Sequence, residues 1–562
     1  MNKRRFTRSA LACAALLLAA ITSQAQPLSN KPIRIVVPFG AGGVAASGSG
    51  VWAQNQIGMR VHAGVDTEDI VVGTRASRII VGNAHILADD NSNIRSHAGA
   101  ASIAAALAGA SGVAVSVGVS LARNVIDSVV LAGLKGAELD ARGQLDLVAT
   151  SNAAINVKAW AASVAAGFGG AAGVGVSGAG ASAMNVILGD VLAQVDDSAI
   201  RAASDVTVKA LATNRIEAII VSASLGVGVG GANGAGASIG VALARNYIGY
   251  DPLQWDGAVT YTSGVSQPSS IKTGDLIRLG ATSGARANEV YEYIGTDPIL
   301  AQDKDGDGKL DELILKQDYG DTKKWKQRTT ASANRIIASV DRSAINALDD
   351  ATLTLDLTIW ADTAQTIEST VVAGSMAIAG GTTGVALSGA GAGATNLIGS
   401  ETRAYLQRTT GAGVEVDGNI LIDARDRSTI NSYVQAVSVA ASFAPTGAAV
   451  AIGVSVAENE INSTVTATVD RAVVEALGDI TITAFDLARI DTTSTAAAMA
   501  ISTGAGAAIS GGGAYAYNTI NTVTAAVVDR TGSVPVAGNP ETGKTRLTTG
   551  KTLTVRAEGN AQ

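Results

Sequence analysis

Cysteine, histidine, proline and aromatic residues are all scarce in this chain of 562 residues. It has one cysteine, three histidines and nine prolines, and aromatic side chains make up 4% of it. The lone cysteine, Cys13, excludes an intramolecular disulfide framework. The histidines His62, His85 and His97 all precede residue 100, so no Ser-His-Asp arrangement can recur along the chain, and no H-E-x-x-H metal motif is present. Few aromatic residues also leave little surface for stacking against sugar rings.

The first 25 residues have the three parts of a secretory signal peptide. MNKRRFTR is basic, SALACAALLLAAI is apolar, and Ser23-Gln24-Ala25 is a small-x-small cleavage site. The apolar run is too short to span a membrane, so we predict an exported protein with no membrane span. Removal of these residues takes the formal charge from −7 to about −11, and this acidic balance argues against nucleic acid as a partner.

Small residues, in contrast, are abundant throughout the chain. Ala, Gly, Val, Ser and Thr dominate, and 65 residues are glycine. Such side chains suit thin, stacked layers rather than one thick globular core. Between residues 449 and 490, apolar residues alternate with small or polar ones, as in GVSV, STVTATV and DITITA. This period of two is typical of strands with one buried face.

Two markers recur through the chain and define a repeat. The first marker is an alanine followed six residues later by isoleucine, at Ala88/Ile94, Ala149/Ile155, Ala210/Ile216, Ala361/Ile367, Ala424/Ile430 and Ala484/Ile490. The second is an asparagine with isoleucine two residues later, at Asn124, Asn185, Asn246, Asn396, Asn459 and Asn518. The two markers keep register over six copies, with a unit of about 61 residues.

The repeat predicts an all-β fold, a repetitive β-solenoid resembling a β-helix, with one small β-rich insertion. We expect each unit to form three rungs of about 20 residues, and the chain to form roughly nineteen rungs in a rod about 90 Å long. The recurring asparagine suits either a left-handed turn or a stacked amide ladder. Membrane helices are the rival for the apolar stretches 101–122 and 224–244, but alternation with glycine and serine favours strands.

The markers divide the mature chain into four segments. Residues 26–43 lie outside the repeat. Residues 44–250 hold the first repeats, 251–330 form the insertion, and 331–562 hold further repeats that end within a unit, so we expect this chain to belong to a longer protein. A second Asn-x-Ile, Asn334/Ile336, marks the end of the insertion, whose segments GDLIRLG, EVYEYIG and LILKQDYGDTKKW are predicted strands.

The segment QPLSNKPIRIVVPFGAGG at 26–43 resembles the start of the periplasmic substrate-binding proteins of tripartite tricarboxylate transporters. In that family the stretch is a first strand and a glycine turn that helps to hold a carboxylate. The resemblance implies a carboxylate-binding transport component, but it ends at Gly43. We therefore interpret 26–43 as an export leader and a flexible junction, and keep transport as an alternative.

The repeat units over 44–562, of the form A-x-N-x-I…V-x-A…GDITITA-x-D-x-x-x-I, resemble those of giant secreted bacterial exoproteins of the haemagglutinin or adhesin type. This resemblance implies a structural or adhesive segment, extracellular or at the cell surface, without catalysis. Its expected partners are cell-surface or matrix components, or further copies of the chain placed end to end or side by side. The periplasm is the alternative location, and a carbohydrate-active β-helix enzyme is a further alternative function.

One stretch of the insertion predicts a metal site. Asp303, Asp305, Asp307 and Asp311 follow the spacing of an EF-hand loop, with Gly308 at its sixth position. Three alternate carboxylates suit Ca²⁺, which takes six to eight oxygen ligands. Ile314 occupies the place of the final bidentate glutamate, so an Asp-rich solvated turn is the alternative. No catalytic or other cofactor-binding residue is assigned.

Two recurring surface patterns have structural interpretations. The Asp-Arg pairs Asp341-Arg342, Asp470-Arg471 and Asp529-Arg530 occupy equivalent places in the repeat, which predicts a solvated or paired turn. Threonines at 464, 466, 468, 481 and 483 could form a flat hydroxyl array, although threonine is also simply a good strand former.

Overall fold

The chain is described by a computed structural model. It describes residues 39–40, 43–66, 78–250, 259–263, 266, 268–279, 290–300, 314, 317, 324–328, 334–348, 354–529 and 545–562. These residues form strands, turns and bends, with no helix among them. Accordingly, no helix in the described part of the chain could cross a membrane, and the stretches 101–122 and 224–244, for which membrane helices were the alternative, are strands.

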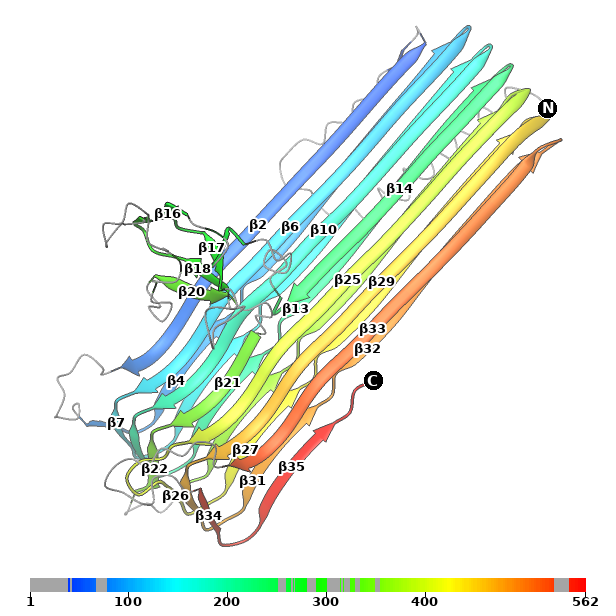
Figure 1. The fold of residues 1–562 in the computed structure, drawn as a ribbon. Helices are drawn as coiled ribbons and strands as arrows, with labels where there is room; N and C mark the ends of the chain where they lie inside the picture. The colour runs from blue at the N-terminus through cyan, green and yellow to red at the C-terminus, as the bar shows by residue number, and fades with distance from the viewer. Residues whose placement is uncertain are drawn as a thin grey trace.

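The described strands build a parallel β-solenoid of seven stacked rungs (Figure 1). Each complete rung contributes one strand to each of four sheets, A to D, in that order along the chain. Neighbouring strands within every one of these sheets are parallel and follow one another in rung order. The predicted all-β solenoid fold is confirmed.

The strands of the four sheets are as follows. Sheet A contains β1 (Phe39–Gly40), β5 (Asn93–Ala108), β9 (Ala154–Gly169), β13 (Arg215–Gly230), β24 (Thr366–Gly380), β28 (Thr429–Phe443) and β32 (Arg489–Thr503). Sheet B contains β2 (Val44–Asp66), β6 (Ser111–Lys135), β10 (Ala172–Asp196), β14 (Asn233–Ile248), β21 (Asn334–Asp341), β25 (Thr383–Gln407), β29 (Thr446–Asp470) and β33 (Ala507–Asp529). Sheet C contains β3 (Ile79–Val81), β7 (Glu138–Ala141), β11 (Ala199–Ala202), β22 (Ala344–Ala347), β26 (Val414–Val416), β30 (Val473–Ala476) and β34 (Arg546–Thr549). Sheet D contains β4 (Ala84–Asp90), β8 (Leu145–Ser151), β12 (Val206–Ala212), β23 (Leu357–Thr363), β27 (Ile420–Asp426), β31 (Ile480–Asp486) and β35 (Leu553–Gly559).

One repeat unit makes one rung, so the predicted three rungs per unit are wrong. Asn124 of β6 pairs with Asn185 of β10, and Asn185 pairs with Asn246 of β14, so the marker advances by one strand per unit. Seven rungs stack to only about 30 Å, while a 25-residue strand such as β6 runs for about 80 Å. The long dimension therefore lies along the strands and not along the stack. The period-two alternation continues without a turn residue, so each strand extends far beyond the usual length.

The outer part of the solenoid, which we call the blade, is two sheets thick. It consists of sheet A and the N-terminal halves of the sheet B strands, which face each other across short turns such as Gly231-Ala232. Its interior is made largely of alanine, serine and glycine. A Cβ atom on Gly175 would overlap the carbonyl oxygen of Val227 in the facing sheet. The two backbones thus approach so closely that only glycine fits there.

The remainder, which we call the base, is thicker. The C-terminal halves of the sheet B strands pack against sheets C and D around a core rich in valine, isoleucine and leucine. Between base and blade lies a separate isoleucine cluster that joins the two marker isoleucines, for example Ile126 from the asparagine marker and Ile155 from the alanine marker. The two sequence markers therefore meet in space at the junction of base and blade.

A left-handed turn closes each described sheet B strand in the middle rungs. The residue after the strand has a positive φ at Gly136, Asp197, Arg342, Arg408 and Arg471. The arginines at this turn bind aspartates that end the strands: Arg342 Nη2 lies 2.6 Å from Asp196 Oδ2, and Arg471 Nε lies 2.9 Å from Asp470 Oδ2. The Asp-Arg pairs are thus paired turns, as predicted, while Arg530 lies outside the described residues.

The insertion interrupts a sheet B strand in the fourth rung. β14 ends at Ile248 and β21 resumes at Asn334, and both lie between β10 and β25. Asn334 repeats the Asn-x-Ile pattern of the marker, but it does not occupy the marker place that Asn185 holds in its own rung. It pairs with Ser400, and its Oδ1 accepts a hydrogen bond from the Gly189 amide at 3.0 Å. The marker place in this rung belongs to Asn246.

Small strands with their own core form the described part of the insertion (Figure 1). These are β15 (Tyr261–Thr262), β16 (Ser270–Ile271), β17 (Leu276–Arg278), β18 (Val290–Tyr293), β19 (Ile299–Leu300) and β20 (Trp325–Arg328). The predicted strands at GDLIRLG and EVYEYIG correspond to β17 and β18. Of LILKQDYGDTKKW the structure describes four residues, among them the buried Ile314 and Trp325, at which β20 begins.

Residues 39–40 of the predicted leader belong to the solenoid. As β1 they pair in parallel with β5 at the edge of sheet A, and the carbonyl of Gly43 accepts a hydrogen bond from the amide of Val113 at 2.6 Å. The interpretation of this end as a flexible junction outside the repeat is therefore wrong for these residues. The signal peptide 1–25 and residues 26–38 lie outside the described residues.

Candidate functional site

Inward-facing polar residues form ladders that run along the stack. The marker asparagines, with Asn55 added at one end, hydrogen-bond through their side-chain amides from rung to rung at 2.7–2.8 Å. Five of the seven, from Asn124 to Asn459, are at most 1% exposed. The predicted stacked amide ladder is correct, and the left-handed turn is not. Each interior amide both donates and accepts, so the ladder satisfies buried polar groups and fixes the register.

Serine hydroxyls form a second inward set, inside the blade. Ser116 of β6 contacts Ser102 and Ser163 of sheet A at 2.7 and 2.9 Å. Ser388 of β25 contacts Ser375 and Ser438 in the same way, at 2.8 and 2.9 Å. Because these hydroxyls satisfy one another between the two sheets, they are structural groups and are not offered to a ligand.

Buried carboxylates occur at the corner between sheets D and A. Asp90, Asp426 and Asp486 are at most 1% exposed. Asp426 accepts hydrogen bonds from the Ser428 amide, at 2.8 Å, and from the Ser400 hydroxyl. Burial raises the pKa of Asp426 to about 6, against the opposing effect of the serine hydrogen bonds. In their three rungs these carboxylates tie sheet B to the corner, through Ser128, Ser400 and Ser463, and they are closed to a substrate.

The outward face of sheet D carries alternating cationic and aromatic side chains. Arg425 lies between Trp360 and Phe485, with its guanidinium carbon 5.6 and 5.5 Å from the two ring centres. Its Nε also lies 2.6 Å from Asp423, a carboxylate 1% exposed whose pKa is raised by burial. The cations and rings already contact one another, which is typical of a self-satisfied surface ladder.

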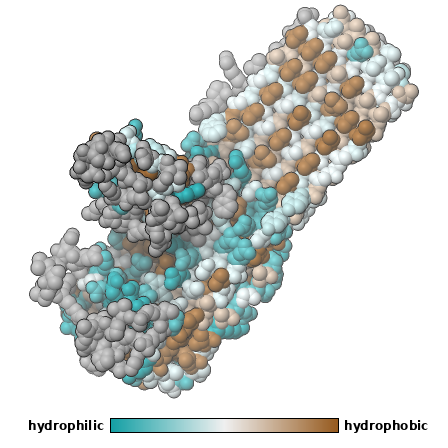
Figure 2. All heavy atoms as spheres, viewed as in Figure 1, coloured by the Kyte–Doolittle hydropathy of each residue, from teal (hydrophilic) through white to brown (hydrophobic). Residues whose placement is uncertain are grey.

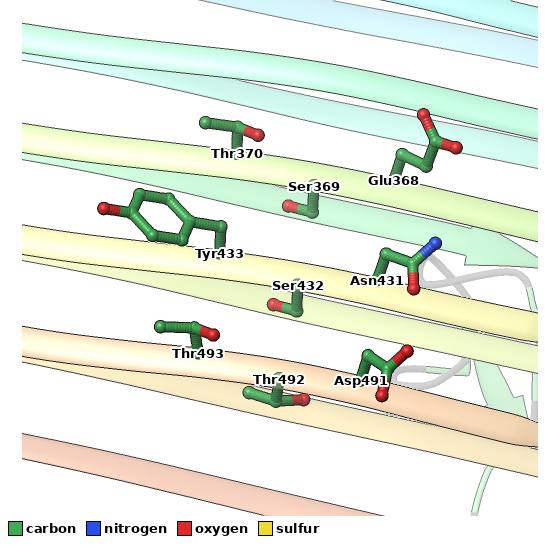
Figure 3. A pocket seen from close by; sticks show the side chains of 9 residues that line it. All are labelled: Glu368, Ser369, Thr370, Asn431, Ser432, Tyr433, Asp491, Thr492 and Thr493. Carbon is green, nitrogen blue, oxygen red and sulfur yellow. The ribbon is translucent and has the colours of Figure 1, made fainter.

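A further candidate site is a shallow polar depression on the outward face of sheet A (Figure 3). Three neighbouring strands, β24, β28 and β32, each contribute three successive residues in register. Glu368, Asn431 and Asp491 share one register position. Thr370, Tyr433 and Thr493 share another position, two residues further on. Between them, Ser432 and Thr492 face inward to Asn396 and Asn459 of the asparagine ladder.

The charges in this depression are already paired. Arg215 Nη2 lies 2.6 Å from Glu368 Oε2, and Arg489 Nη2 lies 2.6 Å from Asp491 Oδ2. The side chains of Glu368 and Asp491 are 40% and 55% exposed. Each of these carboxylates thus lies beside an arginine and is partly open to solvent. The arrangement can offer hydrogen bonds to a polar ligand, but it is not enclosed.

The structure does not test the metal site predicted from the sequence, and it places the three histidines on three different sheets. Asp303, Asp305, Asp307 and Asp311 lie outside the described residues, so the calcium site stays a prediction. His62, His85 and His97 lie exposed on sheets B, D and A respectively, and His85 Nδ1 lies 3.0 Å from Asp146. Within the described ranges, no group of three or more His, Cys, Asp or Glu residues could hold a metal ion.

The threonines do not form a flat array. Thr464, Thr466 and Thr468 face outward on β29, but their neighbours on β25 are Glu401, Arg403 and Tyr405. Thr483 of β31 is buried and donates a hydrogen bond to Asp423 at 2.7 Å. The interpretation of these residues as strand formers is the one that the structure supports.

Sequence reasoning missed the depression on sheet A and the buried aspartates. Glu368, Asn431 and Asp491 each follow a marker isoleucine by one residue, at Ile367, Ile430 and Ile490. Aligning the units in one-rung register would have placed them side by side. No protein-family model, curated protein or solved structure gives a significant match to the chain.

Proposed function

We propose that this chain is an exported structural and adhesive segment of a large bacterial surface or secreted protein. One observation carries the proposal: the two markers repeat at inward positions in rung after rung, whereas the outward positions of sheet A at the depression differ from strand to strand. The marker asparagines from Asn124 to Asn459 are buried, as are the marker isoleucines from Ile94 to Ile461. The outward column across the depression, in contrast, changes from Arg95 through Asn156 to Glu368. A rung whose inward residues repeat, so that it stacks on its neighbours, while the outward residues of sheet A vary, suits a scaffold.

The resemblance of the repeats to haemagglutinin and adhesin exoproteins supports the same role, and so does the signal-like start. On this proposal the chain is extracellular or at the cell surface, and it binds cell-surface or matrix components without catalysis. The two alternatives receive less support. Transport rests on the leader alone. Among the described residues, the depression on sheet A is the site that a carbohydrate-active enzyme could use, and its carboxylates are paired with arginines.

Adhesion of beads coated with the full chain tests the proposal. We expect the beads to adhere to host-cell or matrix-coated surfaces, and we expect the double variant Glu368→Gln/Asp491→Asn to adhere equally well, because a scaffold does not depend on one pair of carboxylates. Beads coated at equal density with unfolded chain are the control. Polysaccharide cleavage that the double variant abolishes would favour the enzyme, and dicarboxylate binding in calorimetry would favour transport.

The same assay examines the predicted calcium site in the insertion. If Asp303, Asp305 and Asp307 bind Ca²⁺ with the weak affinity of extracellular sites, millimolar calcium is required to fill them. Calcium should then protect the insertion from protease, and Asp305→Ala should remove this protection while adhesion by the solenoid continues. Equal cleavage with calcium and with a chelator would leave an ordinary Asp-rich turn.

A further inference from the structure

The outward face of sheet B in the blade is a continuous uncharged surface. It spans five register positions, marked in β6 by Val113, Val115, Val117, Val119 and Leu121, on all seven strands from β2 to β33. None of these positions holds a charged residue. Large side chains on it are well exposed, such as Trp52 at 62%, Ile239 at 61% and Ile509 at 63%. We call this surface the apolar face, and Figure 2 shows its rows of hydrophobic residues.

Two register positions of the apolar face alternate strictly between glycine and a β-branched residue. At the Val117 position the seven strands carry Gly48, Val117, Gly178, Ile239, Gly389, Ile452 and Gly511. At the Val119 position they carry Gly50, Val119, Gly180, Val241, Gly391, Val454 and Gly513. The face is therefore corrugated, with ridges repeating every second rung, about 9.6 Å apart.

The fold does not require glycine at these places. A Cβ atom built on Gly178, Gly180, Gly389 or Gly391 would have no heavy atom within 4 Å. Glycine weakens a strand through its conformational freedom, and a β-branched residue would strengthen it. This contrasts with Gly175 on the inner face of the same strand, where the facing backbone leaves no room for a side chain. Contacts within one chain therefore do not explain why these outward positions hold glycine, and a contact with another molecule could explain it.

We propose that the apolar face binds a second copy of itself, with the ridges of each copy seated in the glycine gaps of the other. A two-fold axis parallel to the strands places each register position opposite itself and reverses the rung order. With an offset of one rung, every valine or isoleucine of the two corrugated positions then faces a glycine. The large-small alternation is thus self-complementary, as an isologous interface requires.

The size and the rim of the face agree with this partner. Six overlapping rungs and five register positions cover roughly 950 Å² on each copy, and a stable interface buries about 800 Å² per partner. At the next register position, marked by Arg123, the strands carry Gln54, Arg123, Met184, Arg245, Thr395, Glu458 and Tyr517. In either one-rung offset, no two of these residues with like charge face each other.

A lipid surface is the other occupant that such a face could meet. It would gain from apolar area but has no use for gaps at every second rung, since a fluid layer adapts to any shape. The dimer goes beyond the proposed adhesive role, because it depends on the shape of the face alone. The chain can therefore adhere without dimerising, or dimerise without adhering, and the two experiments distinguish these outcomes.

Sedimentation velocity of the full chain over about 0.1–50 μM tests the proposal. We expect the wild type to dimerise in this range. The double variant Gly178→Val/Gly389→Val fills two gaps with the residue type that forms the ridges, and it should weaken dimerisation at least about tenfold. Gly58→Val is the matched control: Gly58 also lies on sheet B with nothing within 4 Å of a Cβ, but outside the apolar face. It should leave dimerisation unchanged.

The gap-filling change separates interdigitation from simple stickiness, because it adds apolar surface. Tighter or equal association of the double variant would overturn the proposal, as would a wild type that stays monomeric at the highest concentration. Oligomers that persist in the double variant would arise from other surfaces and would also count against it. Flotation of a monomeric wild type with phosphatidylcholine vesicles would assign the face to lipid instead. Circular dichroism and thermal unfolding establish that each variant remains folded.

Discussion

The blade and the base are built from the same strands but have opposite interiors. Strand β10 passes Gly175 and Ala181 through the blade and then Val191 and Val195 through the base. Where the inward residues are glycine, alanine and serine, the two sheets approach until backbone faces backbone. Where they are valine, isoleucine and leucine, a third sheet is needed to enclose them. The size of the inward side chain therefore decides the thickness of the solenoid at each place.

The two interiors also differ in charge. Among the described residues the blade interior contains neutral serines, whereas the buried aspartates Asp90, Asp426 and Asp486 lie at the corner beside the base. A buried carboxylate needs several hydrogen-bond donors, and the corner supplies a backbone amide and serine hydroxyls. The serine hydroxyls inside the thin blade bond to one another instead, and the backbone amides of its strands are occupied by the sheets.

The largest expected effect comes from thickening the blade. Gly175→Ala places a methyl group against the backbone of Val227, which cannot move without disturbing its own sheet. We expect a loss of about 4 kcal/mol or more in the free energy of unfolding, or failure to fold. Urea unfolding followed by circular dichroism measures the loss.

The control for this change is Gly178→Ala, on the same strand but on the open side. It should be neutral or stabilising by up to about 1 kcal/mol. If both variants lose stability equally, the blade is not held at backbone contact and the difference between the two interiors is weaker than described.

A smaller effect is expected at the junction between blade and base. Asn246→Ala removes the partner of Asn185 Nδ2 and Asn396 Oδ1, whose bonds to Asn246 measure 2.8 and 2.7 Å. Both neighbours are fully buried, so the loss should be about 2–4 kcal/mol. Asn55→Ala, at the half-buried end of the ladder, breaks one bond and should cost much less. Equal effects of the two changes, measured by thermal unfolding, would show that the ladder does not act as a continuous network.

The smallest effect depends on pH and belongs to the corner beside the base. The pKa of Asp426 is raised from 3.8 to about 6 by burial, so the folded chain binds this proton more tightly than the unfolded chain. The resulting stabilisation is complete below pH 3.8 and is lost as the pH rises through about 6. It amounts to about 1–3 kcal/mol.

Asp426→Asn cannot ionise and should remove this part of the pH dependence. Thermal unfolding midpoints of wild type and variant are compared between pH 4 and pH 7.5. As the pH rises, the midpoint of the wild type should fall relative to that of the variant. Asp491→Asn, an exposed carboxylate on the blade, is the control and should follow the wild type. Parallel curves for Asp426→Asn and wild type would contradict the assignment.

The sequence by itself determined the strand type, the unit length and the inward face. Alternation of small and apolar residues dictates strands, and two markers in constant register dictate a repeat that stacks on itself. It also indicated that Asn124 and its equivalents could form an amide ladder, because a buried asparagine at a fixed place must find a partner in the next copy.

Only the tertiary structure decided how one unit closes. Period two specifies which side of a strand is buried but carries no information on where the chain turns, so three short rungs and one long rung fit the same pattern. The small residues of the blade let two sheets approach to backbone contact, which removes any need for a turn before residue 109 or 170. That closure alone places Val117 beside Gly178 and Glu368 beside Asn431, and so creates both the apolar face and the polar depression.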